Sequence, residues 1–352
     1  MPERSRSRAR LLIRGLRLPF VGRGAVLLYH RVADLARDPW SLAVTPAHFE
    51  AHLAILQRHV LCLPLRELLA RRRAGSLPRQ AVAITFDDGY ADNLHAALPL
   101  LERFGIPVTL FVASGFVGSN SEMWWDRLEQ AVFRTAPLPP RLTVTIGDRR
   151  LDWSEVERPD AEESRVRLHD ALYEALARVD APARERALDS LWRQLDDQPK
   201  LRPSHRPLSL GELEQLAATR FFEIGAHTRT HPHLARITPA RQRTELVGSK
   251  QDLERWLDRP VEMLAYPHGS YSATTLKLMR EAGFGAAFTT QPRVVPHRAD
   301  PLQLPRINVE DCEGEEFEAL LRWYGLAPPR RWWRSRVDSE LRGEGWPRPR
   351  RL

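Results

Sequence analysis

Residues 81–90, AVAITFDDGY, end a short apolar run with two adjacent carboxylates, Asp87 and Asp88, followed by Gly89. Neighbouring side chains of a strand point to opposite faces, so the two carboxylates can share a site only where the chain leaves a sheet. Gly89 permits that turn. Chemistry in α/β proteins is placed at the ends of parallel strands, where one carboxylate can bind a metal while the other takes a proton from water. A solvated turn at a strand end is the alternative interpretation.

The chain around this stretch alternates apolar strands with amphipathic helices. A helix is predicted at 45–60, with Thr45 as its N-cap and Pro46 at its first position. A second helix opens at Thr238-Pro239 and another closes at Gly283. The alternation predicts a parallel sheet, either open or closed into a barrel. The expected strands are 24–30, 81–86, 107–113, 221–227, 261–267, 286–290 and 304–309.

The interval at about 119–207 breaks this rhythm. It contains a hairpin pattern at 142–153, LTVTIGDRRLDW, and two charged amphipathic patterns at about 161–178 and 181–197. We therefore expect an inserted α+β subdomain. The expected division is a basic segment at 1–23, a main domain at 24–329 that carries the insertion, and a Trp/Arg-rich tail at 330–352.

Composition indicates a globular protein whose positive charge lies at its two ends. The chain has 352 residues, 43% of them apolar, which is enough to bury a full core. Seven arginines and one glutamate give residues 1–23 a charge of +6, and eight arginines and three acids give residues 330–352 a charge of +5. Of the total of +8, the body therefore carries −3. A nucleic-acid binder is disfavoured. Two cysteines are too few for a disulfide framework, so a reducing compartment fits best.

The two basic ends suggest contact with an anionic surface. Arg14 and Arg17 interrupt the apolar residues of the first segment, so no signal-peptide core is present, and no apolar run approaches the ~20 residues of a membrane span. We expect a cytoplasmic protein that lies peripherally on the inner face of the membrane through 11–20 and the paired tryptophans at 332–333. A plain solvated tail is the alternative.

A second polar cluster follows another expected strand. In IGAHTRTHPHL, His227 and His231 stand four residues apart, a spacing that brings two imidazoles to one metal. Pro232 biases His231 away from a helix, so a loop at a strand end is the better carrier. Together with an aspartate, the pair would leave one coordination position open for water. Two surface histidines are the alternative interpretation.

At this point the motifs resemble a known family. TFDDGY (85–90) and HTRTH (227–231) are similar to the first two motifs of the NodB-type polysaccharide deacetylases, carbohydrate esterase family 4. YPHGSYS (266–272), LLYHRV (27–32) and LPRINV (304–309) resemble the branch that contains the poly-N-acetylglucosamine deacetylases. The resemblance covers roughly 24–310 apart from the insertion. It implies a distorted (β/α) barrel and metal-dependent removal of acetyl groups from N-acetylated sugars.

The resemblance also implies roles for particular residues. Asp87 would be the general base, and the metal ligands, usually to zinc, would be Asp88, His227 and His231. The groove would be shaped by Tyr266, Pro267 and Gly269. His268 stands where a tyrosine is common in this motif, which puts aromatic stacking on sugar there in doubt.

The general acid is where the sequence departs from the family. The usual Leu-x-His motif is absent after Ala286. His30, at the end of the strand in LLYH, would reach the same barrel mouth and is the expected catalytic histidine, with a backbone-satisfied strand-end histidine as the alternative. His297 is a loop residue with a weaker claim.

Two further motifs have two readings each. Arg306 in PRINV either orients Asp87 through a charge-assisted pair, in the substrate site, or caps the last strand. Trp124 and Trp125 form either a sugar platform or, preferably, the hydrophobic seat of the insertion.

The expected function is thus a metal-dependent hydrolase acting on an N-acetylated glycan or a lipid-linked sugar. The open alternatives are a catalytically silent sugar-binding protein with this fold, and a hydrolase of another amide or of an O-acetyl ester. Intact Asp87, Asp88, His227 and His231 argue against the silent protein.

Overall fold

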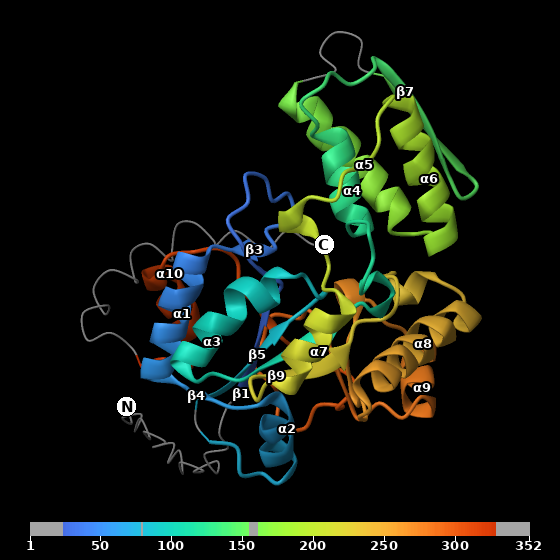
Figure 1. The fold of residues 1–352 in the computed structure, drawn as a ribbon. Coiled ribbons are helices and arrows are strands. Elements are labelled where there is room, and N and C mark those ends of the chain that lie inside the picture. Colours follow the sequence, from blue (N-terminus) through green and yellow to red (C-terminus); the bar gives the residue numbers. More distant parts are fainter. Residues whose placement is uncertain (1–23, 79, 155–160, 329–352) are drawn as a thin grey trace, which may run out of the picture.

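The computed structural model describes residues 24–78, 80–154 and 161–328, and a parallel sheet lies at its centre (Figure 1). Its strands run in the order β11-β10-β9-β6-β5-β1-β12, with β4 also paired to β5. Every pairing within this sheet is parallel, as the sequence pattern predicts. Its members are β1 (Gly24–Tyr29), β4 (Leu61–Cys62), β5 (Ala81–Phe86), β6 (Val108–Val112), β9 (Phe222–Ala226), β10 (Met263–Ala265), β11 (Ala286–Phe288) and β12 (Ile307–Asn308).

One short segment brings the two edges of this sheet together. The backbone of Leu304 donates to Ala287 of β11 at 2.9 Å and accepts from Thr289 at 2.8 Å. Three residues later, Ile307 pairs with Leu27 of β1. The sheet therefore curls into a distorted barrel, which confirms the fold expected from the motifs.

Helices cover the outside of the barrel. The predicted start at Thr45 is confirmed, because its hydroxyl accepts from the backbone N–H of His48, and Pro46 opens the helix. Thr238 caps α8 in the same way, ahead of Pro239. The outer helices are α1 (Pro46–His59), α2 (Leu65–Arg73), α3 (Leu98–Phe104), α7 (Leu210–Ala218), α8 (Pro239–Leu257), α9 (Ala273–Glu281) and α10 (Gly314–Trp323).

Shorter elements complete the main body. A parallel pair is formed by β2 (Arg31–Val32) and β3 (Ala43–Val44), and a π-helical turn (Asn93–Ala97) precedes α3. Single 3₁₀ turns occur at Ser114–Phe116, Pro203–His205, Leu234–Arg236 and Pro267–Gly269. None of the helices in the described part of the chain is long and apolar enough to cross a lipid bilayer.

The barrel is filled by side chains rather than open. Phe111 and Phe288 pack against each other inside it, with ring centroids 5.4 Å apart. Gly225 faces Phe111, and a Cβ there would come within 2.5 Å of the ring. A larger cluster of apolar side chains packs the outer face of the strands against the helices. The strands are thus buried on both faces, which explains their continuous apolar runs.

The inserted segment leaves and rejoins the barrel at adjacent points. The backbone N–H of Gly118 donates to Leu208 at 2.8 Å, and the segment between them stands at one end of the barrel (green in Figure 1). The predicted hairpin and both predicted helices are present, and their apolar side chains form a separate cluster. The elements are α4 (Trp124–Val132), β7 (Arg141–Ile146), β8 (Arg149–Ser154), α5 (Glu162–Leu176) and α6 (Ala181–Gln194).

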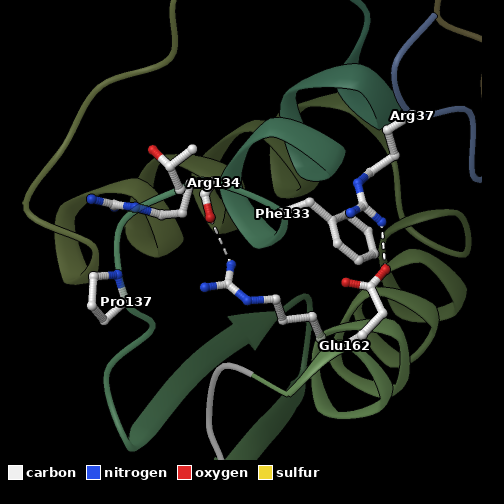
Figure 2. Close-up of a pocket in the computed structure, with 7 residues that line it drawn as sticks. Arg37, Phe133, Arg134, Pro137 and Glu162 are labelled. Atoms are coloured by element: carbon white, nitrogen blue, oxygen red, sulfur yellow. Dashed lines mark hydrogen bonds and ion pairs between the residues drawn. The ribbon is translucent and has the colours of Figure 1, made fainter.

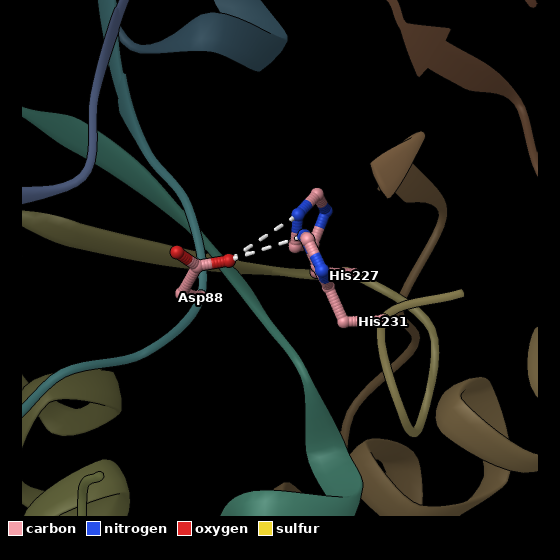
Figure 3. A group of neighbouring side chains, drawn as sticks. All are labelled: Asp88, His227 and His231. Atoms are coloured by element: carbon pink, nitrogen blue, oxygen red, sulfur yellow. Dashed lines mark ion pairs between the residues drawn. The ribbon is translucent and has the colours of Figure 1, made fainter. Parts of the chain in front are cut away.

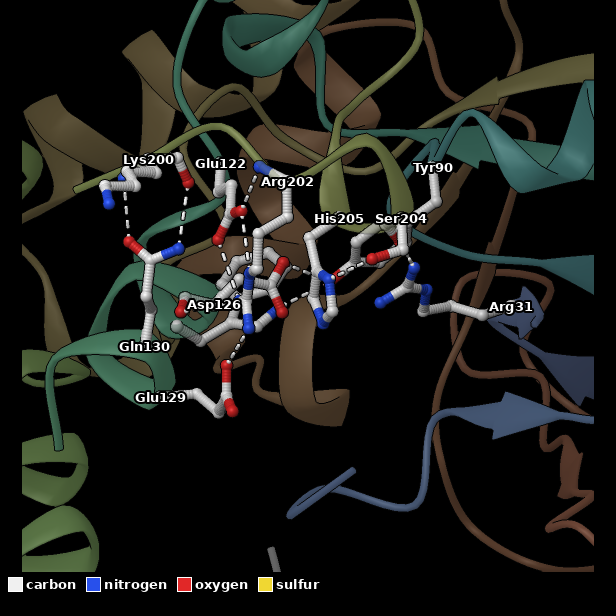
Figure 4. Close-up of polar contacts among 11 residues, drawn as sticks. Arg31, Tyr90, Glu122, Asp126, Glu129, Gln130, Lys200, Arg202, Ser204 and His205 are labelled. Atoms are coloured by element: carbon white, nitrogen blue, oxygen red, sulfur yellow. Dashed lines mark hydrogen bonds and ion pairs between the residues drawn. The ribbon is translucent and has the colours of Figure 1, made fainter. Parts of the chain in front are cut away.

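A buried polar network holds the root of the insertion (Figure 4). Tyr90, just after β5, donates its hydroxyl hydrogen to Asp126 at 2.8 Å and accepts from the indole of Trp125 at 2.7 Å. The guanidinium of Arg31 lies 4.0 Å over the Tyr90 ring. Burial raises the pKa of Asp126 to about 7. Beside it, Arg202 pairs with the Glu122 carboxylate at 2.9 Å. Tyr90 therefore connects the barrel to the insertion through the two hydrogen bonds of its hydroxyl group.

We expect Tyr90→Phe to lower the free energy of unfolding by ~1–3 kcal/mol, because Trp125 and Asp126 both lose a buried partner. Urea denaturation followed by tryptophan fluorescence measures this. Tyr324→Phe is the matched control, since the Tyr324 hydroxyl donates only to the exposed Pro292 carbonyl, and it should change stability by less than ~0.5 kcal/mol. Equal urea midpoints of unfolding for the two variants would show that Tyr90 does not stabilise the contact between the barrel and the insertion.

Candidate metal and catalytic site

Asp87 and Asp88 both lie in a tight turn directly after β5. Asp88 itself adopts a positive φ of 75°, an uncommon conformation for a residue other than glycine, and Gly89 continues the turn at 93°. The turn brings both carboxylates to the barrel mouth, where they are 2% and 3% exposed. The interpretation as a solvated turn is therefore wrong.

Asp88 faces both predicted histidines with one carboxylate oxygen (Figure 3). Its Oδ1 atom is 3.5 Å from Nε2 of His227 and 3.5 Å from Nε2 of His231. One ligand atom from each residue lies within 4.8 Å of the other two, and all three side chains are buried. The alternative of two surface histidines is thus excluded.

The surroundings of these atoms fit a divalent cation. Nδ1 of His227 lies 2.8 Å from the Ala265 carbonyl, so it carries the proton and leaves the Nε2 lone pair facing Asp88. Burial lowers the pKa of His227 and His231, which favours the neutral, ligating form. Asp88 Oδ1 is buried without a hydrogen-bond partner among the described residues. One carboxylate and two imidazoles are a donor set that suits zinc.

The loop between the two histidines is held in an unusual backbone conformation. Thr228 and His231 both have positive φ, 63° and 56°. The hydroxyl of Thr228 accepts from the backbone N–H of His231 at 3.1 Å. This closed turn, rather than a helical face, presents the i and i+4 histidines to one point, as Pro232 suggests.

Asp87 makes a different contact from its neighbour. Arg306 donates to both of its carboxylate oxygens, at 2.7 and 2.6 Å, and is completely buried. The same guanidinium also donates to Thr85 and to the Thr289 carbonyl. Burial, the largest single effect, would raise the pKa of Asp87, but the charge and hydrogen bonds of Arg306 together with His227 and His30 outweigh it and hold that pKa below its usual value. Of the two readings of Arg306, the structure has the charge-assisted pair.

The two adjacent carboxylates are thereby set apart electrostatically. Burial and the charge of Asp87 raise the pKa of Asp88, whereas that of Asp87 is lowered. Asp87 is thus held as an anion by Arg306, whereas Asp88 needs a further cation to hold its charge.

His30 lies next to Asp87 across the β1–β5 ladder. Tyr29 pairs with Phe86, so His30 and Asp87 are the next residues on the two strands. Burial lowers the pKa of His30 to about 4, against the opposing charge of Asp87. Its backbone carbonyl accepts from Asn93 at 3.0 Å, but its half-buried ring makes no hydrogen bond to any described residue.

Of the three expected groove residues, Tyr266 and Pro267 are buried and Gly269 is partly buried. Tyr266 is fully buried, and its hydroxyl donates to the Leu302 carbonyl at 3.0 Å. Pro267 is also buried. Gly269 has a φ of 64°, and a Cβ there would come within 2.4 Å of the Thr290 hydroxyl. These residues hold the loop after β10 in place.

The structure also gives the positions of His297 and of the paired tryptophans Trp124 and Trp125. His297 is exposed and lies beside Gly75, where the chain approaches the start of β5, at the opposite end of the barrel from Asp87. Trp124 and Trp125 are buried in the cluster of the insertion, as the preferred reading predicts. Trp125 also contacts His231, with ring centroids 4.6 Å apart.

Sequence reasoning missed several residues around the metal cluster. His268 lies edge-on to His231 at 4.5 Å and stacks on His233 at 3.8 Å. Tyr173 and Arg184 of the insertion approach the same region. His268 carried only the signal that a tyrosine is usual at its position. The two insertion residues are ordinary members of amphipathic helices and carried no signal.

Comparison with known proteins identifies relatives of this chain. The family model for polysaccharide deacetylase matches residues 74–136 and 167–287, just over half of the chain, and its gap includes the hairpin of the insertion. Poly-beta-1,6-N-acetyl-D-glucosamine N-deacetylase of Staphylococcus aureus strain MRSA252 is 20% identical over 294 residues, covering 81% of this chain and 73% of that protein.

Solved structures share the fold. Streptococcus pyogenes deacetylase PplD, in complex with acetate, superposes with a TM-score of 0.55 at 18% identity and covers 87% of this chain and 99% of its own. IcaB from Ammonifex degensii has a TM-score of 0.55 at 19% identity, covering 86% and 97%.

We expect Asp88→Ala and His231→Ala to weaken zinc binding by more than the ~10–100-fold that loss of an outer-shell partner costs, because each removes a direct donor. Zinc titration of the metal-stripped protein measures the affinity. His297→Ala, an exposed histidine at the other end of the barrel, is the control and should match the wild type. Unchanged affinity in both site variants would mean that the ion binds elsewhere.

Proposed function

This chain belongs to the polysaccharide deacetylase family, and we propose that it is a metal-dependent hydrolase that removes N-acetyl groups from the N-acetylated sugars of a surface polysaccharide or its lipid-linked precursor. The observation that carries the proposal is the separation of roles between Asp87, paired with Arg306, and Asp88, which faces two histidines. The name of the S. aureus relative supports an N-acetylated glucosamine polymer as the substrate class.

Asp88, His227 and His231 would hold the ion. A bound divalent ion supplies a Lewis acid that polarises the acetamide carbonyl and makes water more acidic. Asp87 is the group that accepts the proton of the attacking water, and Arg306 keeps it ionised and fixed in orientation. Because Arg306 is completely buried, its role is to position Asp87 rather than to touch the sugar.

The departing nitrogen needs a proton when the C–N bond breaks. His30 lies beside Asp87 and is neutral in the free protein, because burial lowers its pKa to about 4. A neutral imidazole there can take over the proton that Asp87 has accepted from water and pass it to the leaving amine. The products are acetate and the protonated amino sugar, so atoms and charge balance with one water consumed.

We expect Asp87→Asn to keep its metal and to lose ~10²–10⁴-fold in acetate release from N-acetylglucosamine oligomers, because the amide is nearly isosteric but cannot accept the proton. Metal content and released acetate are measured on the same zinc-loaded sample. Asp258→Asn, an exposed residue at the end of α8, is the control and should retain wild-type rates.

The alternatives give different results in this assay. A silent sugar-binding protein would bind the oligomers without releasing acetate in any form. A hydrolase of O-acetyl esters would release acetate from O-acetylated but not N-acetylated sugars. Acetate release by Asp87→Asn within tenfold of the wild type would assign the base to another group.

We also propose that the protein acts at the inner face of the membrane. The segments involved, 1–23 and 330–352, lie outside the described residues, and their sequence charges of +6 and +5 are what supports the proposal. Arginines near an anionic bilayer contribute about 1 kcal/mol each, so two basic ends would act together.

Co-sedimentation with vesicles tests the membrane proposal. We expect binding to phosphatidylserine-containing vesicles that weakens with added salt and falls when residues 1–23 are deleted, because the attraction is electrostatic. Equal binding to neutral phosphatidylcholine vesicles, or binding to neither, would contradict it and would leave the deacetylase proposal untouched.

A further inference from the structure

Arg184 of α6 is a buried cation with few partners. It is 1% exposed, and its guanidinium lies 4.6 Å over the ring of Trp124. One nitrogen, Nη2, donates to the Thr230 carbonyl at 2.9 Å. Nε and Nη1, which carry three N–H groups between them, have no hydrogen-bond partner among the described residues, and no carboxylate there forms an ion pair with Arg184.

Two other buried arginines are paired directly with carboxylates. Arg306 has both oxygens of Asp87, and Arg31 has Asp92 at 3.0 Å. Taking a cation out of water without an opposite charge or hydrogen bonds is costly, so a buried guanidinium normally has an anion beside it. The carboxylates of Glu185, Glu245 and Asp180 act on Arg184 from a distance, but none of them forms an ion pair with it, so among the described residues Arg184 has no direct anionic partner.

A second group of arginines, Arg37, Arg134 and Arg165, lines a cavity at the insertion, but these arginines have partners (Figure 2). This cavity, of about 330 Å³, is open to solvent. Arg37 pairs there with Glu162 at 2.5 Å, and Arg134 with Asp197 at 3.3 Å. Arg165 donates to backbone carbonyls. Each of these charges is already satisfied within the protein.

Arg184 lies at the seam between the insertion and the metal cluster. Thr230, its hydrogen-bond partner, immediately precedes His231. Trp124 stacks on Tyr173 at 5.1 Å, and the Tyr173 hydroxyl is 3.5 Å from Nδ1 of His268, which touches His231. A continuous set of contacts thus joins the guanidinium to a candidate metal ligand.

The unsatisfied groups along this seam are mainly hydrogen-bond donors. The indole N–H of Trp124 is buried without a partner among the described residues, as are Nε and Nη1 of Arg184. Indole and guanidinium nitrogens can only donate. A ligand that satisfies them must carry acceptor oxygens, and the positive charge of the guanidinium favours those of a carboxylate or a phosphate.

We infer that Arg184 binds an anionic group of the substrate, a carboxylate or a phosphate carried on or next to the sugar that presents its acetamide to Asp87. The inference rests on the proposed function and narrows its substrate class to anionic N-acetylated glycans. Burial lowers the pKa of Arg184 to about 10, so it stays cationic at neutral pH. The guanidinium geometry suits both kinds of oxyanion.

Three matched sugars test this on the full, zinc-loaded chain. N-acetylglucosamine is neutral, its uronic acid carries a carboxylate at C6, and its 1-phosphate carries a phosphate. Titration calorimetry gives the affinity of each. We expect at least one anionic sugar to bind ~10-fold or more tightly than the neutral one, since hydrogen bonds to charged groups are the stronger kind. The better anion identifies the source of the charge.

Variants assign the preference to Arg184. Arg184→Gln should bring the ratio of anionic to neutral affinity close to one, whereas Arg184→Lys should keep part of it because the charge remains. Arg186→Gln removes the same charge from an exposed position of α6 and should keep the wild-type ratio. A purely structural Arg184 would lower all three affinities together and leave the ratio unchanged, which would overturn the inference.

Acetate release separates this inference from the proposed function. If the wild type binds and deacetylates neutral and anionic sugars equally well, the role of Arg184 is refuted and the deacetylase proposal stands. If no sugar releases acetate but the anionic preference depends on Arg184, the binding role stands and the proposed reaction fails.

Discussion

The buried ion pair between Asp87 and Arg306 is the constraint on which the site depends. It joins the end of β5 to the segment that closes the barrel, across 219 positions of sequence. Removing one partner of such a pair leaves an uncompensated buried charge, at a cost of ~3–5 kcal/mol. The pair also resolves the problem of two adjacent carboxylates, because it satisfies Asp87 within the protein and leaves Asp88 free to face the histidines.

The insertion does more than extend the barrel. Its two ends meet at Gly118 and Leu208, and Tyr90 joins its polar root to the turn that carries Asp87 and Asp88. Trp125 of the insertion contacts His231, and Arg184 of the insertion donates to the Thr230 carbonyl in the adjacent loop. The candidate metal ligands and Asp87 therefore lie in the barrel, and the insertion contributes side chains that border them.

Much of the fold could be predicted because its signals are local. The Thr45 and Thr238 caps, the apolar strand runs and the hairpin at 142–153 each depend on a few consecutive residues, and the structure contains all of them. Whether the sheet was open or closed could not be predicted from its periodicity. That outcome depends on Leu304 bonding to β11 while Ile307 pairs with β1.

The sequence by itself determined which residues form the candidate metal cluster, since Asp88, His227 and His231 stand in two short motifs that each follow an apolar strand. Only the tertiary structure decided the partners of these residues. In the tertiary structure Arg306 pairs with Asp87, His297 lies at the opposite end of the barrel, and Arg184 lies beside Thr230. The physical reason is that motif spacing follows local backbone geometry, whereas charge compensation is a contact between segments that are distant in sequence and leaves no local pattern.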